Sequence, residues 1–207
     1  MNWLDELPLV AILRGITPQE IAGHLEALIN EGFQAIEIPT NSPDWQQSIA
    51  LAVAQAQGRA AVGAGTVLTT AMAETVARLG GALIVTPNVN PATIAAARRA
   101  DLQVCSGFFT ASEAFAALEA GAQVLKLFPA GAVTGQYLKA LKAVLPSEAP
   151  VLSVGGVTPE TLGYWLDAGC KGAGLGSDLY KPGQRVEQTR DQARRFVQAY
   201  RAWRDNK

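Results

Sequence analysis

Short apolar runs alternate along the chain with longer segments in which apolar residues recur at helical spacing. The runs are rich in Val, Ile, Leu, Ala and Gly on both faces, which is typical of strands covered on both sides of a parallel sheet. The pattern therefore predicts eight buried strands. Their sequences are PLVAILRG (8–15), AIEIPT (35–40), AAVGAGTV (60–67), ALIVTP (82–87), QVCSGF (103–108), QVLKLFPA (123–130), PVLSVGGV (150–157) and GAGLGSDL (172–179).

Each run is followed by a segment with the spacing of an amphipathic helix. The predicted helices cover residues 18–31, 43–56, 70–78, 91–99, 111–119, 134–144, 159–167 and 184–203. Four starts combine a capping residue with a following proline, namely Thr17-Pro18, Ser42-Pro43, Asn90-Pro91 and Thr158-Pro159. Eight β–α units without a low-complexity break favour a closed (β/α)8 TIM barrel of the α/β class, with an open doubly wound sheet as the alternative.

Length and charge narrow the class of protein. A chain of 207 residues suits one sizeable core, so we expect residues 1–207 to form a single barrel domain with a short N-terminal helix and a C-terminal helix. The net charge of −1 and the absence of a basic stripe argue against nucleic acid as a partner. The acidic N-terminal stretch and the lack of an apolar run of about 18 residues argue against a signal peptide or a membrane partner. A cytoplasmic protein is therefore expected.

Cysteine and histidine offer little chemistry in this sequence. Cys105 and Cys170 lie far apart without CxxC spacing, so buried, reduced thiols are expected rather than a disulfide or a metal site. His24 is the single histidine and falls in IAGHLEALI, where a polar helix face accounts for it. Zinc hydrolysis and Ser-His-Asp catalysis therefore lack their usual parts.

Lys126 interrupts the apolar run VLKLFPA. Val124, Leu125, Leu127 and Phe128 occupy both faces of this run, so an edge position for the lysine is disfavoured. A buried ammonium is unfavourable unless it is paired or loses its proton, and a lowered pKa is what an amine nucleophile needs. The run alone leaves two interpretations open, a Schiff-base lysine or a lysine whose stem lies along apolar surface.

Further polar residues end other runs, where (β/α)8 barrels carry their active sites. Glu37, in AIEIP, either forms a buried ion pair with Lys126 or moves protons beside it. We favour the proton shuttle, because desolvation offsets most of the attraction within a buried pair. Arg14 suits a carboxylate or a phosphate through its planar fork. Thr66 ends the third run, either as a substrate ligand or as an ordinary β-branched strand residue.

Two glycine-rich turns end the last two runs. SVGG (153–156) and GLGS (174–177) provide Gly155, Gly156 and Gly176, whose backbone amides can approach an anion, and Ser177, which adds a hydroxyl donor. The seventh and eighth strands are the usual place of the phosphate pocket in such barrels. No Walker-type GxxxxGK[ST] motif is present. A substrate with a keto-acid end and a phosphate end would use all of these groups.

GAGTV, KLFPA, VGGV and GLGSDLY, together with the glutamate of the second run, resemble the 2-keto-3-deoxy-6-phosphogluconate and -galactonate aldolases of the KDPG/KHG family over essentially the whole chain. The resemblance implies a class I aldolase with Lys126 as Schiff-base lysine and Glu37 as acid/base. It also implies a homotrimer, no metal or other cofactor, and cleavage of a keto-deoxy sugar acid phosphate to pyruvate and D-glyceraldehyde 3-phosphate. Its expected substrate contacts are Arg14, Thr66, Gly156, Gly176 and Ser177, with Pro87 and Phe128 keeping water from Lys126.

Within that family the sequence is similar to the galactonate branch. The gluconate enzymes typically carry Thr-Leu-Arg after the glutamate and a threonine before the Gly-Gly pair, where this chain has Pro39-Thr40-Asn41 and Val154. The two substrates differ in configuration at C4, so Val154 is the expected discriminator. We expect cleavage of 2-dehydro-3-deoxy-6-phospho-D-galactonate in galactonate catabolism. The alternatives are the gluconate epimer, dual specificity, or a non-covalent phosphate-sugar isomerase or epimerase.

Overall fold

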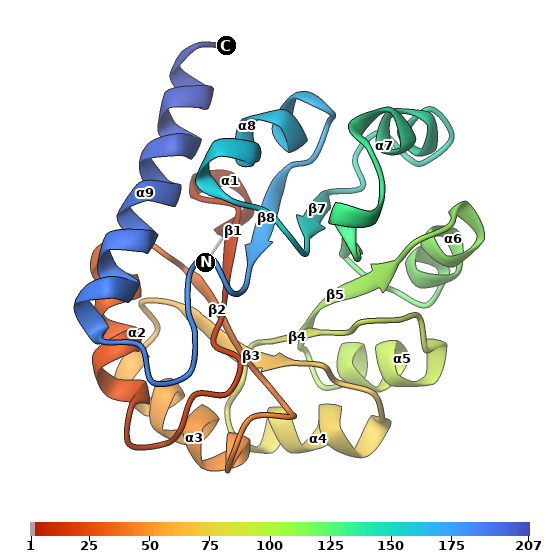
Figure 1. Cartoon of the computed structure of the whole chain (residues 1–207). Coiled ribbons are helices and arrows are strands. Elements are labelled where there is room, and N and C mark those ends of the chain that lie inside the picture. Colours follow the sequence, from red (N-terminus) through yellow and green to blue (C-terminus); the bar gives the residue numbers. More distant parts are fainter. Residues whose placement is uncertain (1–2) are drawn as a thin grey trace.

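The protein, described for residues 3–207 in a computed structural model, is a (β/α)8 barrel, as predicted (Figure 1). Eight parallel strands close into a ring in chain order, each hydrogen bonded to the next and β8 to β1. Every strand lies within a predicted apolar run, and the residues that follow form the β–α loops. The strands are Leu9–Ile12 (β1), Ala35–Pro39 (β2), Ala61–Gly65 (β3), Leu83–Val85 (β4), Gln103–Phe108 (β5), Val124–Leu127 (β6), Val151–Val154 (β7) and Gly172–Leu175 (β8).

Helices surround the ring of strands (Figure 1). They are Trp3–Glu6 (α1), Ile21–Asn30 (α2), Trp45–Ala56 (α3), Thr70–Arg78 (α4), Pro91–Arg99 (α5), Ala111–Glu119 (α6), the 3-10 turn Ala130–Ala132 (η1), Gly135–Lys142 (α7), Pro159–Asp167 (α8) and Val186–Asp205 (α9). Four of them, α4, α5, α6 and α8, have the predicted bounds. Within residues 3–207, no helix is both long enough and apolar enough to cross a membrane.

Two of the four predicted helix caps are confirmed. The Asn90 side chain accepts hydrogen bonds from the first-turn N–H groups of α5, and the Thr158 hydroxyl accepts one from the N–H of Thr161 in α8. Each side chain thereby satisfies backbone donors that have no partner within the helix.

The other two predicted caps are wrong, because α2 begins at Ile21 and α3 at Trp45. The Thr17 hydroxyl instead donates to Glu20 Oε2 at 2.7 Å. The Ser42 hydroxyl accepts from the N–H of Gly15 at 2.9 Å. Both hydroxyls therefore brace the loops after β1 and β2 instead of capping a helix.

The sheet separates two apolar layers. Alternate strand residues fill the barrel interior, among them Val10, Leu83 and Leu152, while the intervening residues pack against the helices. Trp3 from α1 belongs to the interior layer and donates from Nε1 to Gln103 Oε1 at 2.6 Å. The helix α1 therefore closes the N-terminal end of the barrel, and the β–α loops surround the C-terminal end.

The structure also places the two cysteines and the histidine, one of which was predicted differently. The two cysteines are free and buried, as expected. His24 does not lie on a polar helix face: it is only 2% exposed, because α9 and the loop after β8 cover this side of α2. The helical pattern alone does not indicate that α9 returns to pack against α2.

Candidate active site

Lys126 and Glu37 both point into the barrel near its C-terminal end. Lys126 is in β6 and Glu37 in β2, four strands apart in a ring of eight, so the two side chains approach from opposite walls. The strand alternation places Val124 and Lys126 inside, while Leu125 packs outside against the helices. Glu37 is 1% exposed and Lys126 is 6% exposed. Two ionisable groups are therefore held in a largely apolar interior.

The environment of Glu37 favours its neutral form more than water does. Burial raises the pKa of Glu37 to about 7, although the nearby charges of Lys126 and Arg14 and a hydrogen bond from the Gly65 backbone oppose this shift. Its Oε2 atom is buried without a hydrogen-bond partner. A carboxyl group with a pKa of about 7 can both give and take a proton near neutral pH.

The environment of Lys126 also favours the neutral form. Burial lowers the pKa of Lys126, while the carboxylate of Glu37 opposes the shift. The Nζ atom lies 4.6 Å from the centroid of the Phe128 ring. Within residues 3–207, no ion pair joins Lys126 to Glu37. The alternative of a structural ion pair is therefore not what the molecule adopts.

Two strand glycines allow close approaches in this part of the barrel, Gly65 to Glu37 and Gly107 to the loop after β4. A Cβ atom at Gly65 would lie 2.0 Å from Glu37 Oε2, so the carboxylate rests directly on the backbone of β3. Gly107 pairs with Lys126 in the ladder between β5 and β6, and a Cβ there would lie 2.4 Å from the carbonyl carbon of Pro87. Neither glycine stood out in the sequence. Glycine inside a strand, which often marks such a close approach, was the available signal.

Cys105 is another residue of the site that the sequence pattern did not indicate. It belongs to the interior layer and borders the same small cavity as Glu37 and Val154. Burial raises the pKa of the Cys105 thiol to about 12, so it is a neutral group beneath Lys126. Val154, the predicted discriminator, therefore lies on the inner wall within reach of Glu37.

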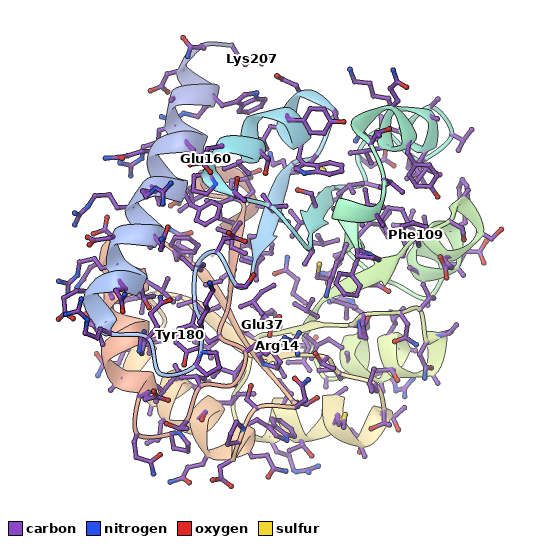
Figure 2. The ribbon with its side chains drawn as sticks, viewed as in Figure 1. Arg14, Glu37, Phe109, Glu160, Tyr180 and Lys207 are labelled. Carbon is purple, nitrogen blue, oxygen red and sulfur yellow. The ribbon has the colours of Figure 1, made fainter. Side chains whose placement is uncertain are left out.

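Arg14 and Thr66 stand at the rim of the barrel. Arg14 follows β1, is exposed, and donates from Nη1 to Asn41 Oδ1 at 2.6 Å. Its charge acts on both Glu37 and Lys126, and Figure 2 shows Arg14 beside Glu37 at the centre of the ring.

Thr66 adopts an uncommon backbone conformation directly after β3. Its φ is +55°, a left-handed value that β-branched residues rarely adopt. The carbonyl oxygen of Thr66 accepts a hydrogen bond from the Thr40 hydroxyl at 2.7 Å, which holds it to the loop after β2. Strained backbone of this kind tends to cluster at functional sites.

The two glycine turns lie on neighbouring strands. Gly155 and Gly156 follow β7 with φ of 99° and 77°, values that favour glycine. Gly176 and Ser177 follow β8, which pairs with β7. Ser177 is exposed, and α8 begins three residues after Gly156. The structure therefore brings the predicted anion-binding groups together at one side of the rim.

Comparisons with known proteins identify the family of this chain. Residues 1–194 match the family model of the KDPG and KHG aldolases. The chain is 57% identical to the 2-dehydro-3-deoxy-6-phosphogalactonate aldolase of Escherichia coli K12, over 97% of this chain and 98% of that one. It is 46% identical to a probable 2-dehydro-3-deoxy-6-phosphogalactonate aldolase of Rhizobium meliloti, over 95% and 93% of the two chains. A solved structure described as native KDPGal superposes with a TM-score of 0.96 at 56% identity, covering 99% and 100% of the two chains. The chain belongs to the KDPG and KHG aldolase family.

Proposed function

We propose that this protein is a class I aldolase that cleaves 2-dehydro-3-deoxy-6-phospho-D-galactonate to pyruvate and D-glyceraldehyde 3-phosphate. One observation carries the proposal: a buried lysine and a buried glutamate face each other across the barrel without forming an ion pair. A structural role would favour a closed pair, because each separated buried charge is unfavourable. A space between an amine and a proton carrier is what carbonyl chemistry requires.

The first stage forms a covalent bond to the substrate. Neutral Lys126, favoured by its lowered pKa, attacks the C2 ketone and gives a carbinolamine. Glu37, with a pKa of about 7, donates a proton to the departing hydroxyl, so that water leaves and an iminium ion remains. The positively charged iminium then accepts the electron pair of the bond that breaks next.

The second stage cleaves the carbon chain. Glu37, now ionised, takes the proton of the C4 hydroxyl, and the C3–C4 bond breaks. The C4 oxygen becomes the aldehyde of D-glyceraldehyde 3-phosphate, and the bond electrons form an enamine with Lys126. Protonation at C3 and hydrolysis of the resulting iminium release pyruvate and restore the amine. A carboxyl group that changes its protonation state easily serves both directions of proton transfer.

The rim residues orient the two ends of the substrate. Arg14 and Thr66 bind the keto-acid end near Lys126, while the turns after β7 and β8 bind the phosphate. The phosphate ligands are Gly155, Gly156, Gly176 and Ser177. Phe128 and Pro87 limit access of water to Lys126. Binding energy from the remote phosphate thereby orients the reacting bond.

The galactonate epimer is the substrate that the relatives and Val154 together support. Both curated relatives above are named for the galactonate compound. Val154 lies on the inner wall with Glu37, and its apolar side chain offers no hydrogen bond to a C4 hydroxyl. Epimer preference then follows from which C4 configuration points its hydroxyl at Glu37. Comparing kcat/KM for the two C4 epimers tests this assignment, and a Val154→Thr variant is expected to narrow their ratio.

The proposal also covers the oligomeric state, the cellular location and the metabolic role of the protein. The family resemblance supports a homotrimer, a cytoplasmic location and a role in galactonate catabolism. Light scattering of the purified protein tests the trimer: a mass three times that of the 21.8 kDa chain supports it, and a monomer contradicts it.

Reductive trapping tests the central step. The protein is incubated with pyruvate and sodium borohydride, and its intact mass is measured. Because borohydride reduces an iminium to a stable amine, we expect one 1-carboxyethyl group per chain, which peptide mapping places on Lys126. Lys126→Ala is the control and should remain unmodified.

A folded wild-type protein that binds phosphorylated sugar acids but gives no adduct would overturn the Schiff base. Lys126 would then bind an anion in a non-covalent isomerase or epimerase. An adduct with turnover of the gluconate epimer alone would retain the mechanism and replace the substrate.

A further inference from the structure

The loop that carries Gly176 and Ser177 is held in place by hydrogen bonds to residues that follow this turn in the chain. This loop, residues 176–185, joins β8 to α9. The Gly176 carbonyl oxygen accepts hydrogen bonds from the N–H groups of Leu179, at 2.9 Å, and Tyr180, at 3.0 Å. The position of the Gly176–Ser177 turn therefore depends on where Leu179 and Tyr180 are held.

A buried polar chain holds that part of the loop. Gln184 Nε2 donates to the Leu179 carbonyl oxygen at 2.9 Å and to Thr189 Oγ1 at 2.8 Å. Thr189 is fully buried in α9, and its Oγ1 lies 2.8 Å from Nδ1 of His24 in α2. The His24 ring also packs edge-on against Tyr180, with centroids 5.0 Å apart. Hydrogen bonds thus run without a break from the loop through α9 to α2.

Two glycines let the loop and α9 approach this closely. A Cβ atom at Gly15 would lie 2.7 Å from Cγ of Pro182, so the loop packs directly on the segment that carries Arg14. A Cβ at Gly23 of α2 would lie 2.8 Å from a methyl group of Val186, the first residue of α9. The loop and the start of α9 therefore pack directly on the glycine backbone of the β1 side of the barrel, in addition to the hydrogen bonds of the polar chain.

We infer that His24 and Thr189 are positioning residues that hold the Gly176–Ser177 turn in the geometry needed to bind the substrate's phosphate. The inference rests on the proposed function, since it takes this turn as the phosphate site. Neither side chain belongs to the rim, and both act through Gln184 and the carbonyl of Leu179. Their loss weakens binding of the phosphate end and leaves the amine chemistry of Lys126 unchanged.

The protonation state of His24 affects its hydrogen bond to Thr189. Burial lowers the pKa of His24, while the charge of Glu20, a hydrogen bond that the imidazole donates to the backbone carbonyl of Gln184 and the charge of Glu187 oppose the shift. Burial also raises the pKa of the facing Tyr180 phenol, which is neutral. The imidazole is therefore neutral at pH 7, and its stabilising contribution to the folded loop is lost as the pH falls through its lowered pKa.

A matched pair of substitutions tests the inference. Thr189→Val keeps the shape of the side chain and removes the oxygen that bonds to both His24 and Gln184, whereas Thr189→Ser retains that oxygen. For Thr189→Val we expect KM for the phosphorylated substrate to rise about tenfold through the loss of two hydrogen bonds. Thr189→Ser should stay near the wild-type KM. The rate of borohydride trapping with pyruvate, which carries no phosphate, should remain within about twofold in both variants.

The possible outcomes are distinct. An unchanged KM in folded Thr189→Val overturns the inference, and so does an equal fall in pyruvate trapping, which indicates general damage to the fold. If Thr189→Val does not fold, Gln184→Met decides the question, because it removes the same link at a partly exposed position. That variant is then expected to raise KM severalfold without changing trapping.

A pH series separates positioning from simple stability. His24→Asn offers an amide oxygen near the place of Nδ1 and does not titrate. Below pH 6.5, the ordinary pKa of histidine, KM of the wild type should rise relative to that of His24→Asn at the same pH. Taking this ratio cancels the titration of the substrate phosphate, whose second pKa is about 6. A flat ratio contradicts the role assigned to His24.

Failure of the proposed function is recognised separately. If wild-type protein gives no adduct with pyruvate, the aldolase mechanism fails whatever the loop does. Binding of D-glyceraldehyde 3-phosphate, followed by calorimetry on wild type, Thr189→Ser and Thr189→Val, then still measures the phosphate turn. Weaker binding in Thr189→Val alone supports the inference, and equal binding in all three overturns it.

Discussion

The two ends of this barrel differ in how their central polar groups are paired. At the N-terminal end, the indole N–H of Trp3 donates to Gln103 at 2.6 Å within the interior layer. At the C-terminal end, Glu37 Oε2 is buried without a partner, and the Lys126 amine has the face of Phe128 as its neighbour. The same ring of strands therefore closes one end with a satisfied contact and leaves two ionisable groups unpaired at the other.

This difference assigns a contribution to stability to the N-terminal end and the catalytic chemistry to the C-terminal end. A paired polar group contributes modestly to folding, whereas an unpaired buried one lowers the free energy of unfolding. The C-terminal end accepts that loss because the shifted pKa values of Glu37 and Lys126 suit proton transfer and nucleophilic attack. Changes at this end should alter the rate most, and changes at the N-terminal end should alter stability alone.

The largest effect on rate among the following changes is expected for Glu37→Gln. The amide keeps the shape but cannot exchange the proton that both stages of the reaction need. We expect kcat to fall by about 10²–10⁴-fold, as for loss of a general acid or base. Steady-state aldol cleavage measures this, with pyruvate release coupled to a dehydrogenase. A kcat close to that of the wild type would remove Glu37 from the chemistry.

Gly65→Ala should produce the next largest effect. The added Cβ would lie 2.0 Å from Glu37 Oε2, so the carboxylate must move although no catalytic group is removed. A misplacement of this size is expected to lower kcat by about 10²-fold. Gly58→Ala is the matched control for added bulk, because no atom lies within 4 Å of its Cβ position, although its φ of +77° adds backbone strain. Equal rates in wild type and Gly65→Ala would contradict the placement of the carboxylate.

A pH dependence of stability follows from the raised pKa of Glu37. The folded chain holds this proton with a pKa of about 7, whereas the ordinary pKa of a glutamate is 4.5. The stability due to neutral Glu37 is therefore complete below about pH 4.5 and is lost as the pH rises to about 7. Glu37→Gln does not lose stability in this way, because its amide does not titrate. The gap in unfolding free energy between variant and wild type, measured by urea denaturation, should widen over that range and then level off.

A constant gap from pH 4.5 to pH 7 would show that Glu37 does not titrate differently in the folded chain. Measurements of both proteins in the same buffers remove the contributions of all other carboxylates, because those are common to the pair.

The smallest effect on rate is expected at the N-terminal end. Trp3→Phe removes the indole N–H that bonds to Gln103 and reduces the buried volume. We expect the unfolding free energy to fall by about 1–3 kcal/mol. Because this change lies at the far end of the barrel, kcat/KM at a temperature where the variant is folded should stay within about twofold. A parallel fall in rate would contradict the separation of the two ends.

Most of the fold follows from local pattern. The eight apolar runs contain the eight strands, because burial on both faces is written into consecutive residues. Lys126 and Glu37 were recognisable because each stands alone among apolar neighbours. The caps at Thr17 and Ser42 were mispredicted because other partners occupy these hydroxyls. The Thr17 hydroxyl donates to Glu20, and the Ser42 hydroxyl accepts from the backbone N–H of Gly15. The local motif does not indicate which partner is nearest.

The sequence by itself determined the repeating β–α units and the residues that carry charge into the barrel, because both depend on neighbours along the chain. The tertiary structure alone decided which of those residues meet. Closure of the ring places Glu37 opposite Lys126 and against the backbone of Gly65, and the return of α9 buries His24. These contacts are between residues far apart in sequence. The pKa of a buried group depends on its distances to such neighbours and on the exclusion of water around it.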